Sequence, residues 1–206
     1  MSSPPAYRIE TKRLVIRCWD PSDAPLMHAA ILENLDHLEP WMPWAHEEPK
    51  SLEQRIEMLR KFRGKFDLGE DFTYAIFNSA ESEVWGGTGL HTRRGEGLRE
   101  IGYWIRADRL NQGYATESTA ALVRVAFELD RVRRVEIRCD PVNERSAAIP
   151  RKLGFTNEGI LRQRDQFRGS GRDTQVWSLL AGEYPASPSS ERSIRAFDAI
   201  GRVLLE

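Results

Sequence analysis

The chain has 206 residues, of which 40% are apolar and 30% are charged, and its formal net charge is −1. This size and composition predict one domain with a sizeable core rather than a collagen-like or disordered chain. The near balance of 30 basic and 31 acidic residues gives no electrostatic basis for bulk nucleic-acid binding. No apolar run approaches the roughly 18 residues that a membrane span needs, and the first residues contain no apolar signal core. We therefore expect a cytoplasmic protein that binds neither nucleic acid nor membrane.

Two cysteines occur, Cys18 and Cys139, far apart and outside any CxxC motif. This disfavours a disulfide framework or a cysteine-based zinc site, and we expect no metal. Cys139 ends a predicted strand and has no histidine beside it in the sequence, so we interpret it as a small buried hydrophobe rather than a nucleophile.

The first half of the chain predicts a strand and two helices. Residues 13–19 (RLVIRCW) alternate apolar and polar side chains, as in a half-buried strand. Pro21-Ser22-Asp23 then begins a helix, and Ser51 with Gln54 forms a capping box that opens a second one. The predicted inner faces are Met27, Ala30, Ile31, Leu35 and Leu38 in the first helix, and Leu52, Ile56, Leu59, Phe62 and Phe66 in the second.

The middle and later parts alternate strands and helices. Residues 72–77, 84–91 and 98–105 are strand-like, and Gly86-Gly87 indicates a bulge or a close backbone approach. Further predicted elements are a helix from Gly113, a strand at 134–139, a helix at 143–153, and strands at 155–164 and 175–180. The expected fold class is α/β (mixed α+β): two early helices, an antiparallel block, then β-α-β-α-β-β.

The last part of the chain follows a Pro/Ser-rich break at residues 185–190. We predict a domain over residues 1–182 and a tail over 183–206 that carries an amphipathic helix at 191–206. Its apolar stripe, formed by Ile194, Phe197, Ile200, Val203 and Leu204, must be covered by the protein's own core or by a second subunit. We expect a homodimer.

The strongest sequence signal for a ligand-binding site is the segment in which the strand at 98–105 leads through a polar loop into a helix at Gly113. The first turn of a helix offers unpaired N–H groups and the positive end of the helix dipole, which suit a phosphate. Small residues at Gly113 and Ala115 would let a pyrophosphate approach the backbone. Alternatively, the glycine simply permits a tight turn from strand to helix.

A second motif is NERSAAIPRKLGF, residues 143–155. Asn143 follows a strand and can cap the next helix, which is the commoner role of such an asparagine. Gly154 stands where a helix usually ends.

Together these segments resemble the GNAT superfamily of acyl-CoA-dependent N-acyltransferases, and specifically the bacterial ribosomal-protein N-terminal acetyltransferases of the RimJ/RimL type. The resemblance covers roughly residues 8–182 and depends on an ordered set: TKRLVIRCWDPSDA, LEPWMPWA, REIGYWI, NQGYATES, NERSAAIPRKLGFTNEG and RDTQVWSLL. It implies a mostly antiparallel sheet flanked by helices, with strands that splay at the cofactor site, and acetyl-CoA as the acyl donor.

The resemblance also implies which residues bind the cofactor. Gly113 and Ala115 occupy the last two places of the family's phosphate loop, Q/R-x-x-G-x-G/A, whereas its first place falls on Leu110. Arg109, Asn111 or Gln112 could substitute, with the backbone N–H groups as the main contact. The residues implied for the cofactor are Tyr103 and Ile105 along the pantetheine, Asn111, Gln112, Gly113, Tyr114, Ala115 and Thr116 at the phosphates, and Asn143 and Ser146 near the thioester.

The catalytic groups follow the family less closely. The tyrosine that many members use as general acid is replaced by Pro150, while Ser146 matches a serine that the subgroup places near the sulfur. The acceptor amine must also lose a proton. Asp165 matches an acidic residue assigned this role in the subgroup, and Glu100, on the strand leading to the cofactor, is the second candidate. Each of these residues could instead have an ordinary structural role.

Two tryptophans, Trp41 and Trp44, lie in a Pro-rich loop that the family places beside the acceptor. They could line a groove for a peptide N-terminus, or simply cover the core. His37, His46 and His91 are weaker candidates, because an isolated histidine is more often structural.

The resemblance predicts direct transfer of an acetyl group to a primary amine, such as a protein N-terminal α-amine. An alternative is an acyltransferase that acts on small amines such as aminoglycosides. A second alternative is a non-catalytic acyl-CoA- or protein-binding module, which the departures at Leu110 and Pro150 leave open. The sequence does not decide between acetyl and a longer acyl group such as succinyl.

Overall fold

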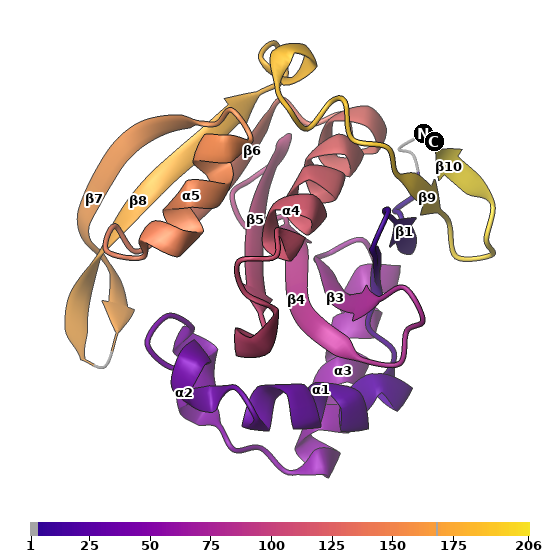
Figure 1. Cartoon of the computed structure of the whole chain (residues 1–206), viewed down its shortest axis with the longest axis vertical. Coiled ribbons are helices and arrows are strands. Elements are labelled where there is room, and N and C mark those ends of the chain that lie inside the picture. The colour runs from indigo at the N-terminus through magenta and orange to yellow at the C-terminus, as the bar shows by residue number, and fades with distance from the viewer. Residues whose placement is uncertain (1–3, 168) are drawn as a thin grey trace.

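The computed structural model describes residues 4–167 and 169–206. Ten strands in these residues form one sheet in the order β10-β9-β1-β2-β3-β4-β5-β6-β8-β7 (Figure 1). Neighbouring strands run antiparallel except for β5 and β6, which are parallel. The predicted fold class, a mixed and mostly antiparallel sheet flanked by helices, is confirmed.

The strands are β1 (Arg8–Glu10), β2 (Leu14–Cys18), β3 (Phe72–Asn78), β4 (Val84–His91), β5 (Leu98–Ile105), β6 (Arg134–Cys139), β7 (Thr156–Phe167), β8 (Ser170–Leu180), β9 (Arg195–Phe197) and β10 (Val203–Leu205). The helices are α1 (Ala24–Leu32), α2 (Leu35–Leu38), α3 (Leu52–Asp67), α4 (Tyr114–Arg124) and α5 (Glu144–Lys152), and a π-helical turn (Val125–Leu129) extends α4. No helix in the described ranges is long and apolar enough to cross a membrane.

The two faces of the sheet carry different helices because the strand side chains alternate between them. On β2, Leu14 and Ile16 join the buried cluster that contains the apolar face of α4. Val15, between them, packs with the cluster that contains Met27 and Ile31 of α1. Figure 1 shows α4 and α5 in front of the sheet and α1 to α3 gathered along its lower end. A side chain's position along a strand therefore decides which helices it meets.

The glycine pair in β4 produces both features that the sequence indicated. The register between β3 and β4 shifts at Trp85, which is a bulge. A Cβ atom at Gly87 would lie 2.6 Å from Nε1 of Trp104 on β5, so the indole ring lies directly over bare backbone.

The parallel strands β5 and β6 stay paired only as far as Ile101, which lies opposite Ile137. Beyond this point β5 continues to Ile105 while pairing with β4 alone. The strands therefore separate in the middle of the sheet, and the last residues of β5 have an edge that β6 does not cover.

The capping box at Ser51 is confirmed: Gln54 N–H donates to Ser51 Oγ at 3.2 Å, and Ser51 N–H donates to Gln54 Oε1 at 2.8 Å. Two details of the first helices differ from expectation. The first helix is divided at Asn34 into α1 and α2. Leu52 and Ile56 of α3 are exposed rather than part of its inner face.

The amphipathic helix predicted for residues 191–206 is wrong. This segment forms β9 and β10, and β9 pairs with β1, so the tail extends the sheet at its edge. The buried residues Ile194 and Ala196 follow the two-residue period of a strand. Gly201, at φ +81°, and the side chain of Asp198, which accepts from the N–H groups of residues 200 and 202, form a tight turn instead of helix.

Candidate active site

The predicted phosphate-binding turn lies between β5 and α4. Gly113 precedes the first helical residue and has φ +83°, and Asn111 is also left-handed at φ +59°. The first i→i−4 bond of the helix runs from Glu117 N–H to Gly113 O at 2.9 Å. The N–H groups of Tyr114, Ala115 and Thr116 thus have no intrahelical acceptor. Such a turn fits a pyrophosphate, because its donors and the helix dipole favour a negative charge.

Arg13, which directly precedes β2, contacts this turn from about 100 residues away in the sequence. Its guanidinium forms an ion pair with Glu117 at 2.6 Å and donates to the carbonyl oxygen of Gln112 at 2.9 Å. It also lies 4.4 Å from the centre of the Tyr114 ring. A Cβ atom at Gly113 would be 3.4 Å from Arg13 Nη2. Sequence reasoning missed this role, since nothing local links Arg13 to the glycine turn.

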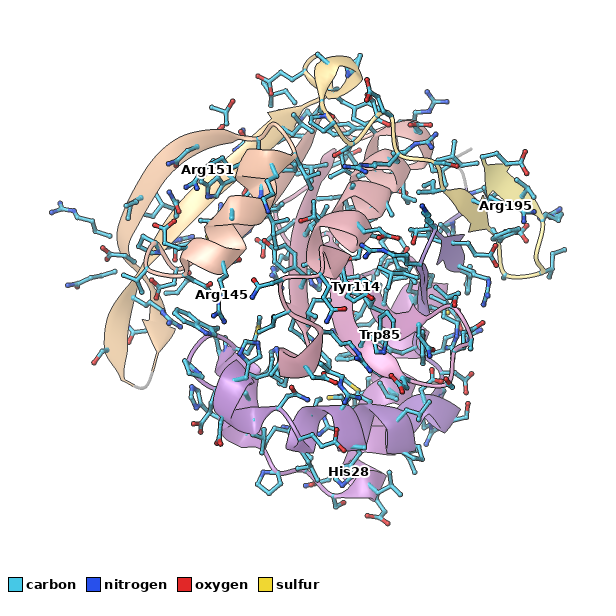
Figure 2. All side chains as sticks on the ribbon, viewed as in Figure 1. His28, Trp85, Tyr114, Arg145, Arg151 and Arg195 are labelled. Carbon is cyan, nitrogen blue, oxygen red and sulfur yellow. The ribbon has the colours of Figure 1, made fainter. Side chains whose placement is uncertain are left out.

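The side chain expected to replace the missing Gln or Arg at position 110 has other contacts. Arg109 pairs with Glu83 at 3.1 Å and lies 5.0 Å from the Trp85 ring. Trp85 in turn packs on Tyr114, with ring centres 4.6 Å apart (Figure 2). Gln112 donates to the carbonyl oxygen of Asp108 at 3.1 Å. The side chains around the turn mainly fix its shape, and the backbone N–H groups are left for the ligand.

Tyr103 and Ser146 meet across the opening between β5 and β6. The Tyr103 hydroxyl donates to the Ser146 carbonyl oxygen at 3.0 Å and lies 3.2 Å from Ser146 Oγ. Burial raises the pKa of Tyr103 above its ordinary value, although the hydrogen bond with Ser146 lowers it. Asn143 caps α5 by accepting from Ser146 N–H at 3.1 Å. Asn143 and Ser146, the two residues implied at the thioester, are therefore joined by a hydrogen bond, and Tyr103 of β5 holds Ser146 in place.

Cys139, at the end of β6, lies beside Ser146. Burial raises the pKa of its thiol to about 11, despite a hydrogen bond with Ser146 that lowers it. Since the thiolate is the nucleophilic form, this supports the interpretation of Cys139 as an unreactive thiol.

A cavity of about 790 Å³ opens on the side of the sheet that carries α1 and α3. It brings together most of the predicted catalytic and acceptor residues: Trp41, Trp44, His91, Glu100, Tyr103, Asn143, Ser146 and Asp165. The Trp44 ring meets Trp104 edge-on, with centres 6.1 Å apart. The phosphate turn does not line this cavity, whereas the residues implied at the thioester do, so the two halves of the site meet at the opening between β5 and β6.

Glu100 is held by arginines rather than left free. Its side chain is 6% exposed and forms ion pairs with Arg93 and Arg94, and Arg138 lies 3.7 Å away. Burial alone would raise the pKa of Glu100, but the two hydrogen-bonded guanidinium groups outweigh it and lower the pKa. A carboxylate in this state is a weak proton acceptor.

Asp165 lies on β7, at the far wall of the cavity. It accepts a hydrogen bond from the Thr174 hydroxyl and is opposite Arg172 in the register of β7 and β8. Arg172 forms an ion pair with Asp140 and donates to the carbonyl oxygen of Pro40 at 2.7 Å. The β7–β8 hairpin thereby reaches the loop that carries the tryptophans.

The three histidines singled out in the sequence have different surroundings. His37 hydrogen-bonds the backbone of Ile105, and burial together with Arg145 lowers its pKa. His46 lies 3.6 Å from Glu39. His91 lines the cavity and is not isolated, because its Nδ1 lies 3.0 Å from both carboxylate oxygens of Asp71. Asp71 was missed in the sequence, where it directly precedes β3 without a motif of its own.

The described residues contain no group of three or more histidine, cysteine or acidic side chains that could hold a metal ion. The site described above consists of the glycine turn, the opening between β5 and β6, and the cavity. This arrangement can hold a phosphate-bearing thioester on one side of β5 and an amine on the other.

Comparison with known proteins agrees with this geometry. Residues 13–156 match the model of the acetyltransferase (GNAT) domain family. The chain is 26% identical to the [ribosomal protein uS5]-alanine N-acetyltransferase of Escherichia coli, over 89% of this chain and 95% of that one. It is 28% identical to the N-acetyltransferase YoaA of Bacillus subtilis, over 84% and 96% of the two chains.

Among solved structures, Mycobacterium smegmatis RimJ in complex with CoA-disulfide superposes with a TM-score of 0.81, at 23% identity, over 92% of this chain and 95% of that one. This likeness confirms the fold. The family match covers well over half of the chain and confirms the predicted resemblance to this acyl-CoA-dependent family, with acetyl as the group that is transferred. The chain belongs to the GNAT acetyltransferases and is an acyl-CoA-dependent N-acetyltransferase.

Proposed function

We propose that the acceptor is the α-amine at the N-terminus of a protein, as in ribosomal-protein acetylation. The observation that carries this proposal is the specificity named for the E. coli relative, which acts on an alanine of ribosomal protein uS5. The cavity supports it. Its volume of about 790 Å³ is within the range of sites that enclose a whole small ligand, so it has room for more than an amino group.

The site residues suggest a division of tasks. The pyrophosphate of acetyl-CoA would bind the N–H groups at Gly113 to Thr116, and the pantetheine would follow β5 along Tyr103 to Ile105, near Asn143. The amine nitrogen attacks the thioester carbon, the C–S bond breaks, and the departing thiolate accepts a hydrogen bond from Ser146. Because both reactants are held in one site, proximity supplies much of the rate.

A pair of peptides tests the acceptor. One begins with alanine or serine and has a free α-amine; the other has the same sequence, an acetylated α-amine and one internal lysine. Release of free thiol from acetyl-CoA should occur with the first peptide and not with the second. Turnover with the lysine peptide, or only with small amines such as aminoglycosides, would disprove the α-amine acceptor while leaving the acetyltransferase activity in place.

Trp41 and Trp44 are proposed to contact the acceptor. Arg172 lies 5.7 Å from the Trp41 ring, and Trp44 packs on Trp104. We expect Trp44→Ala to raise the KM for the peptide about tenfold, which corresponds to ~1.4 kcal/mol, and to leave the affinity for CoA unchanged.

We also propose a homodimer that acts in the cytoplasm, where ribosomal-protein acceptors are made. Because the tail forms a hairpin and not an apolar helix, the dimer is now supported by two exposed apolar residues of the β9–β10 hairpin, Ile200 (76%) and Val203 (47%). Replacing both with serine should shift the mass measured by light scattering from dimer to monomer. A wild-type protein that is monomeric at high concentration would refute the dimer.

A further inference from the structure

Acetyl transfer requires that the acceptor lose a proton, since an ammonium group has no lone pair. The two carboxylates that the sequence indicated for this task are poorly suited to it. Glu100 is already bound by three arginines. Asp165 is on β7, which is separated from β5 by three strand intervals, or roughly 14 Å along the sheet.

We propose that His91, oriented by Asp71, is the base that takes this proton. The pair faces the cavity from the sheet itself: His91 ends β4, and Asp71 directly precedes β3 on the neighbouring strand. The Nδ1 atom lies 3.0 Å from each carboxylate oxygen, and the His91 side chain is 17% exposed. Within residues 4–167 and 169–206, no hydrogen-bond partner engages Nε2.

The state of Asp71 decides which ring nitrogen is available. Burial would raise the pKa of Asp71, but the hydrogen bond and charge of His91, the N–H of Thr92 and the charge of Arg93 together outweigh it, so the pKa is lowered and the carboxylate stays ionised. An ionised carboxylate at Nδ1 keeps the proton there and leaves the lone pair on Nε2. It also stabilises the imidazolium that forms when Nε2 takes a proton.

The position of Nε2 follows from two glycines. A Cβ atom at Gly89 would lie 2.7 Å from Nε2, so the ring rests on the bare backbone of its own strand. A Cβ atom at Gly102 on β5 would lie 3.6 Å from Nε2. Apart from Ile101 and Tyr103, the other described atom within 4 Å is Cδ2 of the same ring. A group placed over Gly102 would therefore touch the free nitrogen of His91.

Gly102 is also the first residue of β5 beyond the last pair with β6, Ile101 opposite Ile137. This is where the strands separate and where the thioester is expected. An amine over Gly102 would thus lie between the proton acceptor and the acyl carbon. The charged groups that face His91 are Asp71 on the β3 side, Glu100 opposite it on β5, and Arg93 in the following loop.

The step is balanced. The ammonium group gives one proton to Nε2, and the neutral nitrogen attacks the acetyl carbon. The C–S bond breaks, the product nitrogen loses its second proton to the thiolate or to water, and the imidazolium returns its proton to solvent. No redox partner is needed.

The test uses the full-length enzyme, acetyl-CoA and whichever amine the wild type accepts, so it does not depend on the acceptor being an α-amine. His91→Ala should lower kcat by about 10²–10⁴-fold, with the affinity for CoA in calorimetry unchanged. Added imidazole should restore part of the rate, which a merely structural role would not allow. With an acceptor whose amine is already neutral at the assay pH, His91→Ala should lower kcat much less.

Asp71→Asn should lower kcat less than His91→Ala, and the double variant should be no slower than His91→Ala alone, because the two residues act as one unit. Glu100→Gln and Asp165→Asn test the two alternative bases. The proposal is overturned if His91→Ala keeps its rate within a few fold of wild type. It is equally overturned if imidazole restores nothing, or if only Asp165→Asn or Glu100→Gln shows the loss.

Discussion

The two sides of β5 are built in different ways. On the side of α4, the proposed donor site is made of backbone: the N–H groups of a helix start, a left-handed glycine, and the open edge of a strand. On the side of α1 and α3, the proposed acceptor site is made of side chains from distant segments, such as Trp44, Asp71, His91 and Arg172. A backbone site can be formed by one short segment of the sequence, whereas a site made of side chains from distant segments depends on the whole fold.

This contrast predicts the largest effect for a change that closes the backbone site. Gly113→Glu would force a side chain into φ +83° and place a negative charge at the phosphate turn. We expect CoA affinity to fall at least about 10²-fold, equivalent to ~2.7 kcal/mol, in isothermal calorimetry. Gly201→Glu is the matched control: its φ is +81°, the described residues beyond its chain neighbours leave the added Cβ free within 4 Å, and it lies between β9 and β10 at one end of the sheet. Unchanged affinity in Gly113→Glu would disprove the location of the pyrophosphate.

The acceptor side can be disturbed by a single methyl group. Gly102→Ala places a Cβ atom 3.6 Å from His91 Nε2, in ordinary contact, where the amine is expected. The methyl group should lower kcat/KM for the acceptor roughly 10- to 10²-fold by displacing the amine, without reducing CoA affinity. Steady-state kinetics with each substrate varied in turn separates the two effects. A loss confined to the KM for acetyl-CoA would show that Gly102 belongs to the donor side instead.

A third variant tests whether a side chain also contributes to CoA affinity on the donor side. Arg13→Gln leaves the Glu117 carboxylate without its ion pair in the first turn of α4. We expect CoA to bind about tenfold more weakly, by ~1.4 kcal/mol, because an unpaired negative charge then lies near the phosphates. Adding Glu117→Gln should restore much of the affinity if charge is the cause. No recovery in the double variant would instead mean that the bond from Arg13 to the Gln112 carbonyl fixes the turn.

The smallest effect is expected away from both sides of β5. Hydrogen bonds from Arg134 and the Ser178 hydroxyl lower the pKa of Glu158 to about 2. Its folded-state pKa is below the unfolded value near 4.3, so its contribution to stability is present above about pH 4.3 and is lost as the pH falls towards 2.

Glu158→Gln should therefore lower the free energy of unfolding at pH 7 by less than about 1 kcal/mol, as for other exposed pairs. Urea unfolding of wild type and variant should converge near pH 2, and activity should be unaffected. Glu57→Gln, which removes an exposed pair with Arg60, is the control. A difference between wild type and Glu158→Gln that persists at pH 2 would contradict the ion-pair explanation.

Local patterns predicted most of the fold. Strands β4, β5 and β6 have the expected bounds, and the Ser51 capping box and Gly113 turn are where the sequence indicated. The tail prediction is wrong because the spacing of its apolar residues is compatible with both a helix and a hairpin, and the turn at Asp198 and Gly201 selects the hairpin.

The site was predictable to a different extent on its two sides. Gly113 and Asn143 belong to contiguous motifs and could be named with their neighbours. The partners of His91 and Arg13 could not, because Asp71 is 20 residues from His91 and Glu117 is 104 residues from Arg13. The sequence separation of these pairs carries no signal: the β3–β4 register brings Asp71 to His91, and the packing of α4 against β2 brings Glu117 to Arg13.

The pairing of β1 with both β2 and β9 has a consequence for how the chain is made. Residues 8–10 leave the ribosome well before their partners at 195–197, because more than 180 residues separate the two segments. During synthesis, β1 can pair with β2 but has an open outer edge, and open edges are the places where chains join one another and aggregate. A chain that stalls before residue 195 would keep this edge exposed. In the folded protein β9 lies beside β1 (Figure 1), so this edge is closed by a segment that is synthesised after β1 and β2.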